Sequence, residues 1–233
     1  MPTLRLLTAS TWLALAVLVA SVESARSSPT ATLPASVGAP WFGELGPGAV
    51  RLAPGPGFTI RRPERTWGTP STVALVQRVL ANMHALRPLA HTLAVGDLSV
   101  RRGTKITLHR SHQTGRDLDV GFYYASKPTS YPQDFVAATK ASLDLPLTWE
   151  LLWQFLSLRD HNGGVATVFV DYQVQQWLFE YGESIGVPHQ VLYETFQYPR
   201  GIGAPGAIVR HVPGHLDHFH IRFACHEADY FCE

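Results

Sequence analysis

Cysteine is scarce in this chain, and so is any excess of charge of one sign. The 233 residues include two cysteines and two methionines, and 19 Lys and Arg residues against 18 Asp and Glu residues give a net charge of +1. Two cysteines are too few for a four-cysteine zinc site or for a small fold held together by several disulfides. The near-neutral charge shows no sign of the basic surface that binds nucleic acid, so we expect no nucleic-acid partner.

Long apolar runs are missing as well, except for a shorter one at the amino end. There, Arg5 precedes about a dozen apolar residues that run to Ala20, and small residues lead to Ala25. A membrane-spanning helix needs about 20 apolar residues, so the pattern favours a cleavable signal peptide over residues 1–25, with an uncleaved anchor as the alternative. We therefore expect a periplasmic or secreted protein with no stable membrane insertion after signal removal.

The remainder of the chain has the size of one domain that follows an irregular start. Residues 26–59 are rich in proline and glycine and show little periodicity, which predicts an arm or linker without regular structure. Residues 60–233 form the expected domain, and a hydrophobic content of 45% with 16% charged residues is enough for a packed core.

Hydrophobic periodicity predicts both helices and strands in this domain. Apolar residues at helical spacing, with start and stop signals, predict helices between residues 70 and 87, 146 and 156, and 171 and 186. Runs rich in β-branched or alternating residues predict strands at 92–95, 98–101, 105–108, 118–124, 165–170 and 218–224. The order predicts an α+β fold, a single domain with a central antiparallel or mixed sheet flanked by helices.

Histidine is the residue type that stands out. The chain has 11 histidines, and seven lie within residues 109–112 and 211–226, which together make up 20 positions: His109, His112, His211, His215, His218, His220 and His226. Random placement would put about one histidine there, so the clustering indicates metal binding or catalysis.

Alternation along two of the predicted strands brings polar side chains to one face. If residues 117–122 are extended, Asp117 and Asp119 share a face while the residues between them enter the core. Gly115 permits a tight turn that returns His112 to the start of this strand. The same parity places His218 and His220 together, on one face with Arg222.

These groups have the chemistry of a catalytic zinc site. His112, Asp119 and His220 can supply two nitrogens and one oxygen, which leaves a coordination position for water. His218 would then lie beside the metal as a general base, although parity alone does not decide which of His218 and His220 binds the ion. Asp117 is expected either to orient a ligating histidine or to be a solvated carboxylate at the strand end.

The two histidine motifs also resemble those of a known enzyme group. His112 with Asp119 seven positions later, followed by His218-Phe-His220, is similar to the metal motif of the lysostaphin, D-alanyl-D-alanine peptidase and hedgehog group. More narrowly, Ser111-His-Gln-Thr-Gly-Arg-Asp-Leu-Asp119 and His215-Leu-Asp-His218-Phe-His220-Ile-Arg222 resemble the penicillin-insensitive murein endopeptidase family, over about residues 36–233.

This resemblance implies a function and a set of roles. It implies one zinc ion per chain bound by His112, Asp119 and His220, with His218 as the catalytic base and with His109 and His215 in support. It also implies a hedgehog-like or D-Ala-D-Ala-peptidase-like fold, and cleavage of the amide that joins D-alanine to meso-diaminopimelate in peptidoglycan stem peptides. The alternatives are a carboxypeptidase or dipeptidase that releases D-alanine, and a non-catalytic cell-wall-binding module that contains metal.

Two further features complete the expectations. In an exported protein Cys225 and Cys232 are expected to form a disulfide, and their binding of zinc together with His226 is the alternative. Arg116 stands where an apolar residue is more usual in the family, a difference that would bear on which stem-peptide carboxylate is contacted.

Overall fold

The computed structural model describes residues 33–233, so the predicted signal peptide at 1–25 lies outside the described residues. The four α-helices of this part are α1 (Pro70–Leu86), α2 (Leu145–Leu156), α3 (Tyr172–Ser184) and α4 (His189–Thr195). The first three confirm the helices expected from periodicity, whereas α4 was not expected. Within residues 33–233, none of the helices combines the length and the apolar character needed to cross a membrane.

Side-chain caps explain where the three long helices begin. The side chains of Thr69, Asp144 and Asp171 each accept a hydrogen bond from a backbone N–H in the first turn of α1, α2 and α3, respectively. These bonds satisfy N–H groups that have no partner inside the helix.

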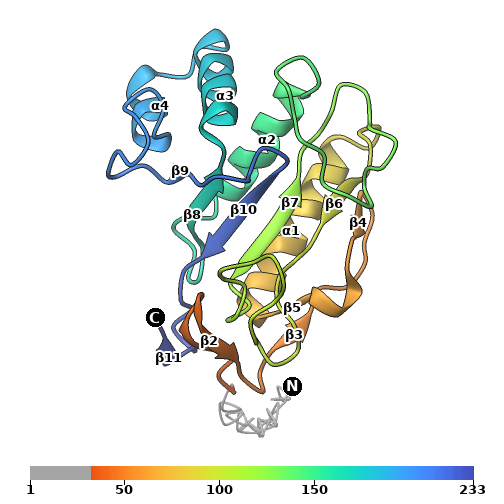
Figure 1. Ribbon diagram of the computed structural model, residues 1–233, viewed down its shortest axis with the longest axis vertical. Helices are drawn as coiled ribbons and strands as arrows, with labels where there is room; N and C mark the ends of the chain where they lie inside the picture. The colour runs from red at the N-terminus through yellow and green to blue at the C-terminus, as the bar shows by residue number, and fades with distance from the viewer. Residues whose placement is uncertain (1–32) are drawn as a thin grey trace, which may run out of the picture. The chain divides into compact units, whose positions relative to one another are not determined.

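A six-stranded mixed sheet forms the centre of the fold (Figure 1), in the order β4-β6-β7-β10-β8-β9. Its strands are β4 (Phe58–Ile60), β6 (Leu93–Val95), β7 (Asp117–Gly121), β8 (Val165–Val170), β9 (Val209–His211) and β10 (His218–Phe223). Strand β10 is antiparallel to both β7 and β8, whereas β4 with β6 and β8 with β9 are parallel pairs. The predicted α+β architecture with a central mixed sheet is therefore confirmed.

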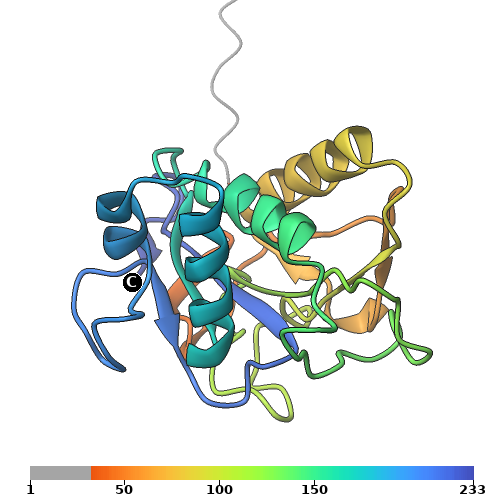
Figure 2. The same cartoon turned by 90° about the horizontal axis from the view of Figure 1, so that it is seen from above.

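One face of the sheet is closed by the core. Leu118, Val120, Phe219, Ile221 and Phe223 are fully buried and belong to one hydrophobic cluster with residues of α1 and α2. The two helices lie together on this side of the sheet (Figures 1 and 2). Alternation then leaves the intervening polar side chains of β7 and β10 on the opposite face.

The residues near the start of the described chain are more regular than expected. Within the stretch predicted to be irregular, strands β1 (Ser36–Ala39), β2 (Phe42–Leu45) and β3 (Val50–Arg51) form, and β3 pairs with β5 (Trp67–Gly68). Strand β1 pairs with β2 and also with β11 (Phe231–Cys232). The expectation of little regular structure was wrong here: β1 and β2 pair within this segment, and β1 and β3 also find the partner strands β11 and β5 outside it.

Two predicted strands are absent from the described structure. Residues 98–101 and 105–108 lie in a long connection between β6 and β7 that contains no strand. Their apolar residues are used to anchor this connection instead, since Leu98 is fully buried and Ile106 is largely buried.

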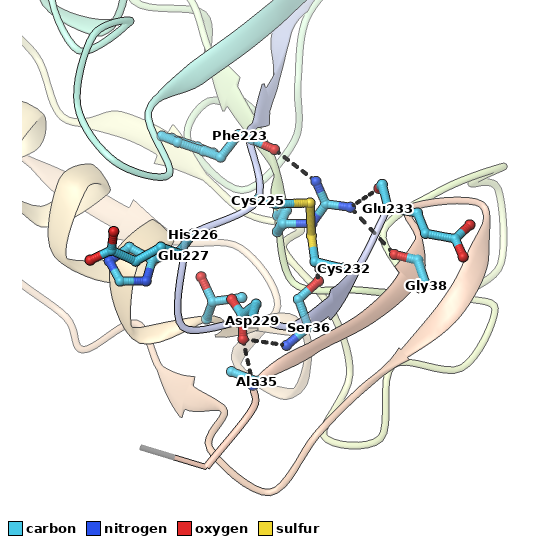
Figure 3. The surroundings of a disulfide bond; sticks show 12 residues. Ala35, Ser36, Gly38, Phe223, Cys225, His226, Glu227, Asp229, Cys232 and Glu233 are labelled. Carbon is cyan, nitrogen blue, oxygen red and sulfur yellow. Dashed lines mark hydrogen bonds between the residues drawn. A yellow bond between two sulfur atoms is a disulfide. The ribbon is translucent and has the colours of Figure 1, made fainter. Parts of the chain in front are cut away.

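The two cysteines form the expected disulfide, with an S–S distance of 2.07 Å. The alternative in which these cysteines bind zinc is thereby wrong, because neither is a free thiol. Within the closed loop, Asp229 accepts hydrogen bonds from the backbone N–H groups of Ala35 (2.7 Å) and Ser36 (3.0 Å), as Figure 3 shows. The carboxyl-terminal loop therefore holds the start of β1.

Arg116 belongs to the same junction and not to a substrate site. Its guanidinium is almost completely buried and donates hydrogen bonds to Ser36 Oγ (3.0 Å) and to the carbonyl oxygens of Phe223 (3.1 Å) and Glu233 (2.6 Å). The expectation that it bears on a stem-peptide carboxylate was wrong, since these bonds with chain oxygens use the guanidinium.

Candidate metal centre

Pairing of β7 with β10 makes the two predicted polar faces into one surface. In the antiparallel register, His220 lies opposite Asp119, Arg222 opposite Asp117, and His218 opposite Gly121. Residues that lie opposite each other on neighbouring strands point to the same side of the sheet. The histidines of one motif therefore face the carboxylates of the other, although about 100 residues separate them.

A tight turn before β7 brings His112 to this surface. Gly115 has φ of 66°, and a Cβ atom there would lie 2.7 Å from the Cα atom of Gly68, so glycine is required. His112 also adopts a left-handed conformation, with φ of 66°. Its backbone N–H donates to Asp117 Oδ2 (2.9 Å), and its Nδ1 donates to the carbonyl oxygen of Leu98 (2.7 Å).

Three imidazoles surround the Asp119 carboxylate. His112 Nε2 lies 3.3 Å and His220 Nδ1 3.6 Å from Asp119 Oδ1, and His109 Nδ1 lies 3.7 Å from Oδ2. His112 Nε2 and Asp119 Oδ1 are buried and have no hydrogen-bond partner among the described residues. Potential ligand atoms of His109, His112 and Asp119 all lie within 4.8 Å of one another, so this group could hold a metal ion.

Carboxylates behind the centre hold two of these rings. Asp117 is fully buried, lies 3.0 Å from His220 Nε2 through its Oδ1, and accepts a hydrogen bond from Arg222 Nε (2.8 Å). The alternative of a solvated carboxylate for Asp117 is therefore wrong. Asp97 Oδ2 lies 2.8 Å from His109 Nε2 and was not among the predicted site residues.

Asp97 is the clearest site residue that the sequence prediction lacked. It is buried and also pairs with Arg62 (2.9 Å) and Arg65 (2.8 Å). His109 and Arg65 hold the pKa of this carboxyl at about 2, against the opposing effect of burial. No periodic pattern marked Asp97, because it lies in the connection that follows β6.

Burial and charge pull the pKa values of the central groups in opposite directions. Burial by itself would lower the pKa of His112, but the carboxylates of Asp119 and Asp117 raise it to about 9. Burial would raise the pKa of Asp119, yet the neighbouring imidazoles of His112 and His218 hold it well below its usual range. Burial lowers the pKa of His220, which therefore favours the neutral form that binds metal.

His218 and His215 complete the group. His218 Nε2 lies 3.6 Å from Asp119 Oδ1, its Nδ1 donates to Asp217 Oδ1 (2.5 Å), and its ring stacks on Phe135 at 4.6 Å between centroids. The His215 ring lies 4.8 Å from that of His218, and burial lowers the pKa of His215 to about 4. The structure thus brings together every predicted metal-binding and catalytic residue.

The other two clustered histidines lie elsewhere. His211 Nδ1 accepts a hydrogen bond from the backbone of Tyr172, and His226 Nδ1 accepts one from Ala228 inside the disulfide loop. These bonds account for both residues as local structural groups.

A pocket of about 520 Å³ adjoins the centre. His109, His215 and His220 form part of its wall, together with side chains that the sequence prediction did not include, among them Trp41 and Phe169. A molecule in this pocket would lie against the group that could hold a metal.

The fold and the site define an α+β protein with a buried histidine and aspartate cluster that opens to a pocket. A family model described as penicillin-insensitive murein endopeptidase matches residues 45–148. Over this segment the chain is similar to that peptidase family, which supports the resemblance that the two motifs predict. The matched segment contains the first motif, whereas the second motif lies beyond it. A comparison with curated proteins found no match.

Proposed function

We propose that this protein is an exported, zinc-dependent endopeptidase that hydrolyses the amide between D-alanine and meso-diaminopimelate in peptidoglycan cross-links. The observation that carries the proposal is the pair of buried, unpartnered atoms His112 Nε2 and Asp119 Oδ1, which lie 3.3 Å apart beside an open pocket. Unpartnered polar atoms in a protein interior are costly, and a cation would satisfy both. The match of a murein endopeptidase family model to residues 45–148 supports the substrate class.

The donors fit a zinc site formed by His112, Asp119 and His220. In each histidine, the ring nitrogen that points away from Asp119 lies near an oxygen atom. For His112 this is Nδ1 beside the Leu98 carbonyl, and for His220 it is Nε2 beside the Asp117 carboxylate. Such outer oxygens fix the ring and strengthen the ligand nitrogen. A zinc ion held there would act as a Lewis acid that polarises the scissile carbonyl and lowers the pKa of a water molecule.

We assign the proton transfer to His218. Because its Nδ1–H donates to Asp217, the unprotonated Nε2 faces the centre and can accept a proton. The proton leaves the attacking water for Nε2, and the same nitrogen then donates it to the amine that departs. Stacking on Phe135 holds the ring in the orientation that this transfer needs.

His109 and His215 have supporting roles in this proposal. Asp97 fixes the His109 ring so that Nδ1 faces Asp119, and the imidazolium form of this ring can stabilise the negative charge that develops on the carbonyl oxygen. His215 lines the pocket beside His218 and contacts the bound substrate.

His109 could instead be the third metal ligand, and two variants decide this. We expect zinc to remain at about one equivalent in His109→Ala and to be lost from His220→Ala, as measured by metal analysis of the purified proteins. Loss of zinc from His109→Ala together with its retention in His220→Ala would make His109 the metal ligand in place of His220.

Export to the periplasm or to the outside of the cell is part of the proposal. The signal-like residues 1–25 and the Cys225–Cys232 disulfide both support an oxidising compartment.

The activity is tested on purified cross-linked muropeptide dimers. We expect the zinc-loaded protein to convert dimers into monomers, a chelator to stop the reaction, and added zinc to restore it. Unchanged dimers in the zinc-loaded sample would refute the proposal. Release of free D-alanine in place of monomers would indicate a carboxypeptidase, and bound zinc without any product would indicate a binding module.

A further inference from the structure

The pocket reaches from the metal centre along β10 to Arg222. Along β10, His218 precedes His220 by two residues and Arg222 follows it by two, so all three share one face in this order. Arg222 lines the pocket, whereas His218 does not. A substrate bound at the centre would therefore have His218 on one side and Arg222 on the other.

Arg222 is a cation held in a defined orientation. Its Nε and Nη2 donate to Asp117 at 2.8 and 3.4 Å, and its guanidinium carbon lies 5.1 Å from the ring of Phe169 and 5.6 Å from that of Trp41. Within residues 33–233 its Nη1 has no hydrogen-bond partner, and 18% of the side chain is exposed. The guanidinium is thus fixed on one edge and keeps donors for a ligand.

The charge of the pocket favours an anion. Arg110 is a second cation on its wall and forms no ion pair with the described residues, and the wall contains no Asp or Glu. Asp117 offsets the charge of Arg222 from behind, which leaves Arg110 as the uncompensated charge. A carboxylate is the anion that a peptide substrate would offer to these groups.

Trp41 covers this part of the pocket. It lies in the turn between β1 and β2 and is 60% exposed, which is unusual for so large an apolar side chain. Gln113, next to His112, holds this turn through two hydrogen bonds. Its backbone N–H donates to the carbonyl oxygen of Pro40 (3.1 Å), and its side-chain amide donates to the carbonyl oxygen of Trp41 (2.9 Å). These bonds hold the backbone of the turn that carries Trp41 next to His112.

We propose that Trp41, Arg110 and Arg222 form a subsite that binds a substrate residue bearing a free carboxylate next to the scissile amide. The two arginines bind the carboxylate, and the indole packs on the aliphatic part of the same residue. This inference rests on the proposed function. It narrows the substrate to cross-links in which the residue that supplies the leaving amine keeps a free carboxylate on the carbon atom that bears this amine.

The experiment compares two muropeptide dimers that differ in one group. In the first, the diaminopimelate carboxylate beside the scissile amide is free, and in the second it is a carboxamide. For the zinc-loaded protein we expect kcat/KM to be about 10-fold to 100-fold higher for the free acid, because the amide removes a charge-assisted contact. A third dimer, amidated at its terminal D-alanine carboxylate instead, should be cleaved like the first.

Variants of exposed residues link this preference to the subsite. Arg110→Ala should reduce the ratio of kcat/KM between the two dimers, and Trp41→Ala should raise KM for both. Arg159→Ala, which changes an exposed arginine elsewhere on the chain, should alter neither value. Equal cleavage of both dimers by the wild type, or an unchanged ratio in Arg110→Ala, would overturn the subsite.

The two proposals can fail separately. If neither dimer is cleaved, the proposed endopeptidase activity is wrong, and calorimetry with the zinc-loaded protein still tests the subsite. The free-acid dimer must then bind more tightly than its amidated partner, and equal affinities would refute the subsite.

Discussion

The metal-free protein should lose stability when the pH rises from 6.5 to 9, and His112 is the reason. Its folded-state pKa of about 9 lies above the ordinary value of 6.5 because the protonated ring faces Asp119 and Asp117. A raised pKa contributes stability that is fully present below pH 6.5 and is lost as the pH passes through about 9. At about 1.4 kcal/mol per pH unit, the shift from 6.5 to about 9 contributes at most about 3.5 kcal/mol.

The shifted pKa values of His215, Asp97 and His220 act outside this interval. His215, with a pKa of about 4, and Asp97, with a pKa of about 2, change protonation between the folded and unfolded states only below pH 6.5. Burial lowers the pKa of His220, which places its contribution in the same acidic range. Among these shifted groups, His112 is the one whose pKa change acts between pH 6.5 and 9.

The assay is urea unfolding of the chelated protein at pH 6.5 and at pH 9. We expect the free energy of unfolding to fall by about 1–3 kcal/mol, with similar m-values at the two pH values. The exposed His189→Gln variant should show the same fall, whereas His112→Gln should show none. A free energy of unfolding that stays constant or rises in the wild type would refute the reasoning about this buried charge pair.

Three further predictions follow from the site and its surroundings. His218→Ala should keep about one equivalent of zinc while kcat falls about 100-fold to 10,000-fold, and His226→Ala should change neither; loss of zinc from the first variant would mean that base and ligand are misassigned. Asp117→Asn should weaken zinc binding about 10-fold to 100-fold because it holds two ligand histidines in place, and an unchanged Kd would contradict that role. Cys225→Ser should lower the free energy of unfolding by about 2–3 kcal/mol under oxidising conditions, and equal values for variant and wild type would show that the short loop adds no constraint.

Local pattern alone predicted the parts of the site that lie on strands. Alternation placed His218, His220 and Arg222 on one face of β10, and the register with β7 confirms that parity. The three long helices could also be predicted from the sequence, because a helix start depends on capping groups that are close in sequence. The clustering of histidines in two windows also identified the site before any contact was known.

Periodicity could not reveal the groups that reach the site from elsewhere. Asp97 and Trp41 lie in connections without a repeating pattern, and their positions depend on hydrogen bonds with residues far along the chain. The same limit explains why residues 98–101 and 105–108 were predicted as strands. Apolar residues there are buried in a connection, and a short apolar run does not reveal which partner it meets.

The amino-acid sequence by itself indicated the family resemblance, the three long helices, the alternation of the two site strands and the donor types that a metal ion would need. Only the tertiary structure decided which nitrogen of each ring faces Asp119, that Asp97 and Asp117 stand behind the rings, and that Trp41 covers the pocket. The physical reason is the sequence separation of the interacting residues. Strand alternation and helix capping depend on neighbours along the chain, whereas ring orientation and pocket walls arise from the packing of segments that are distant in sequence.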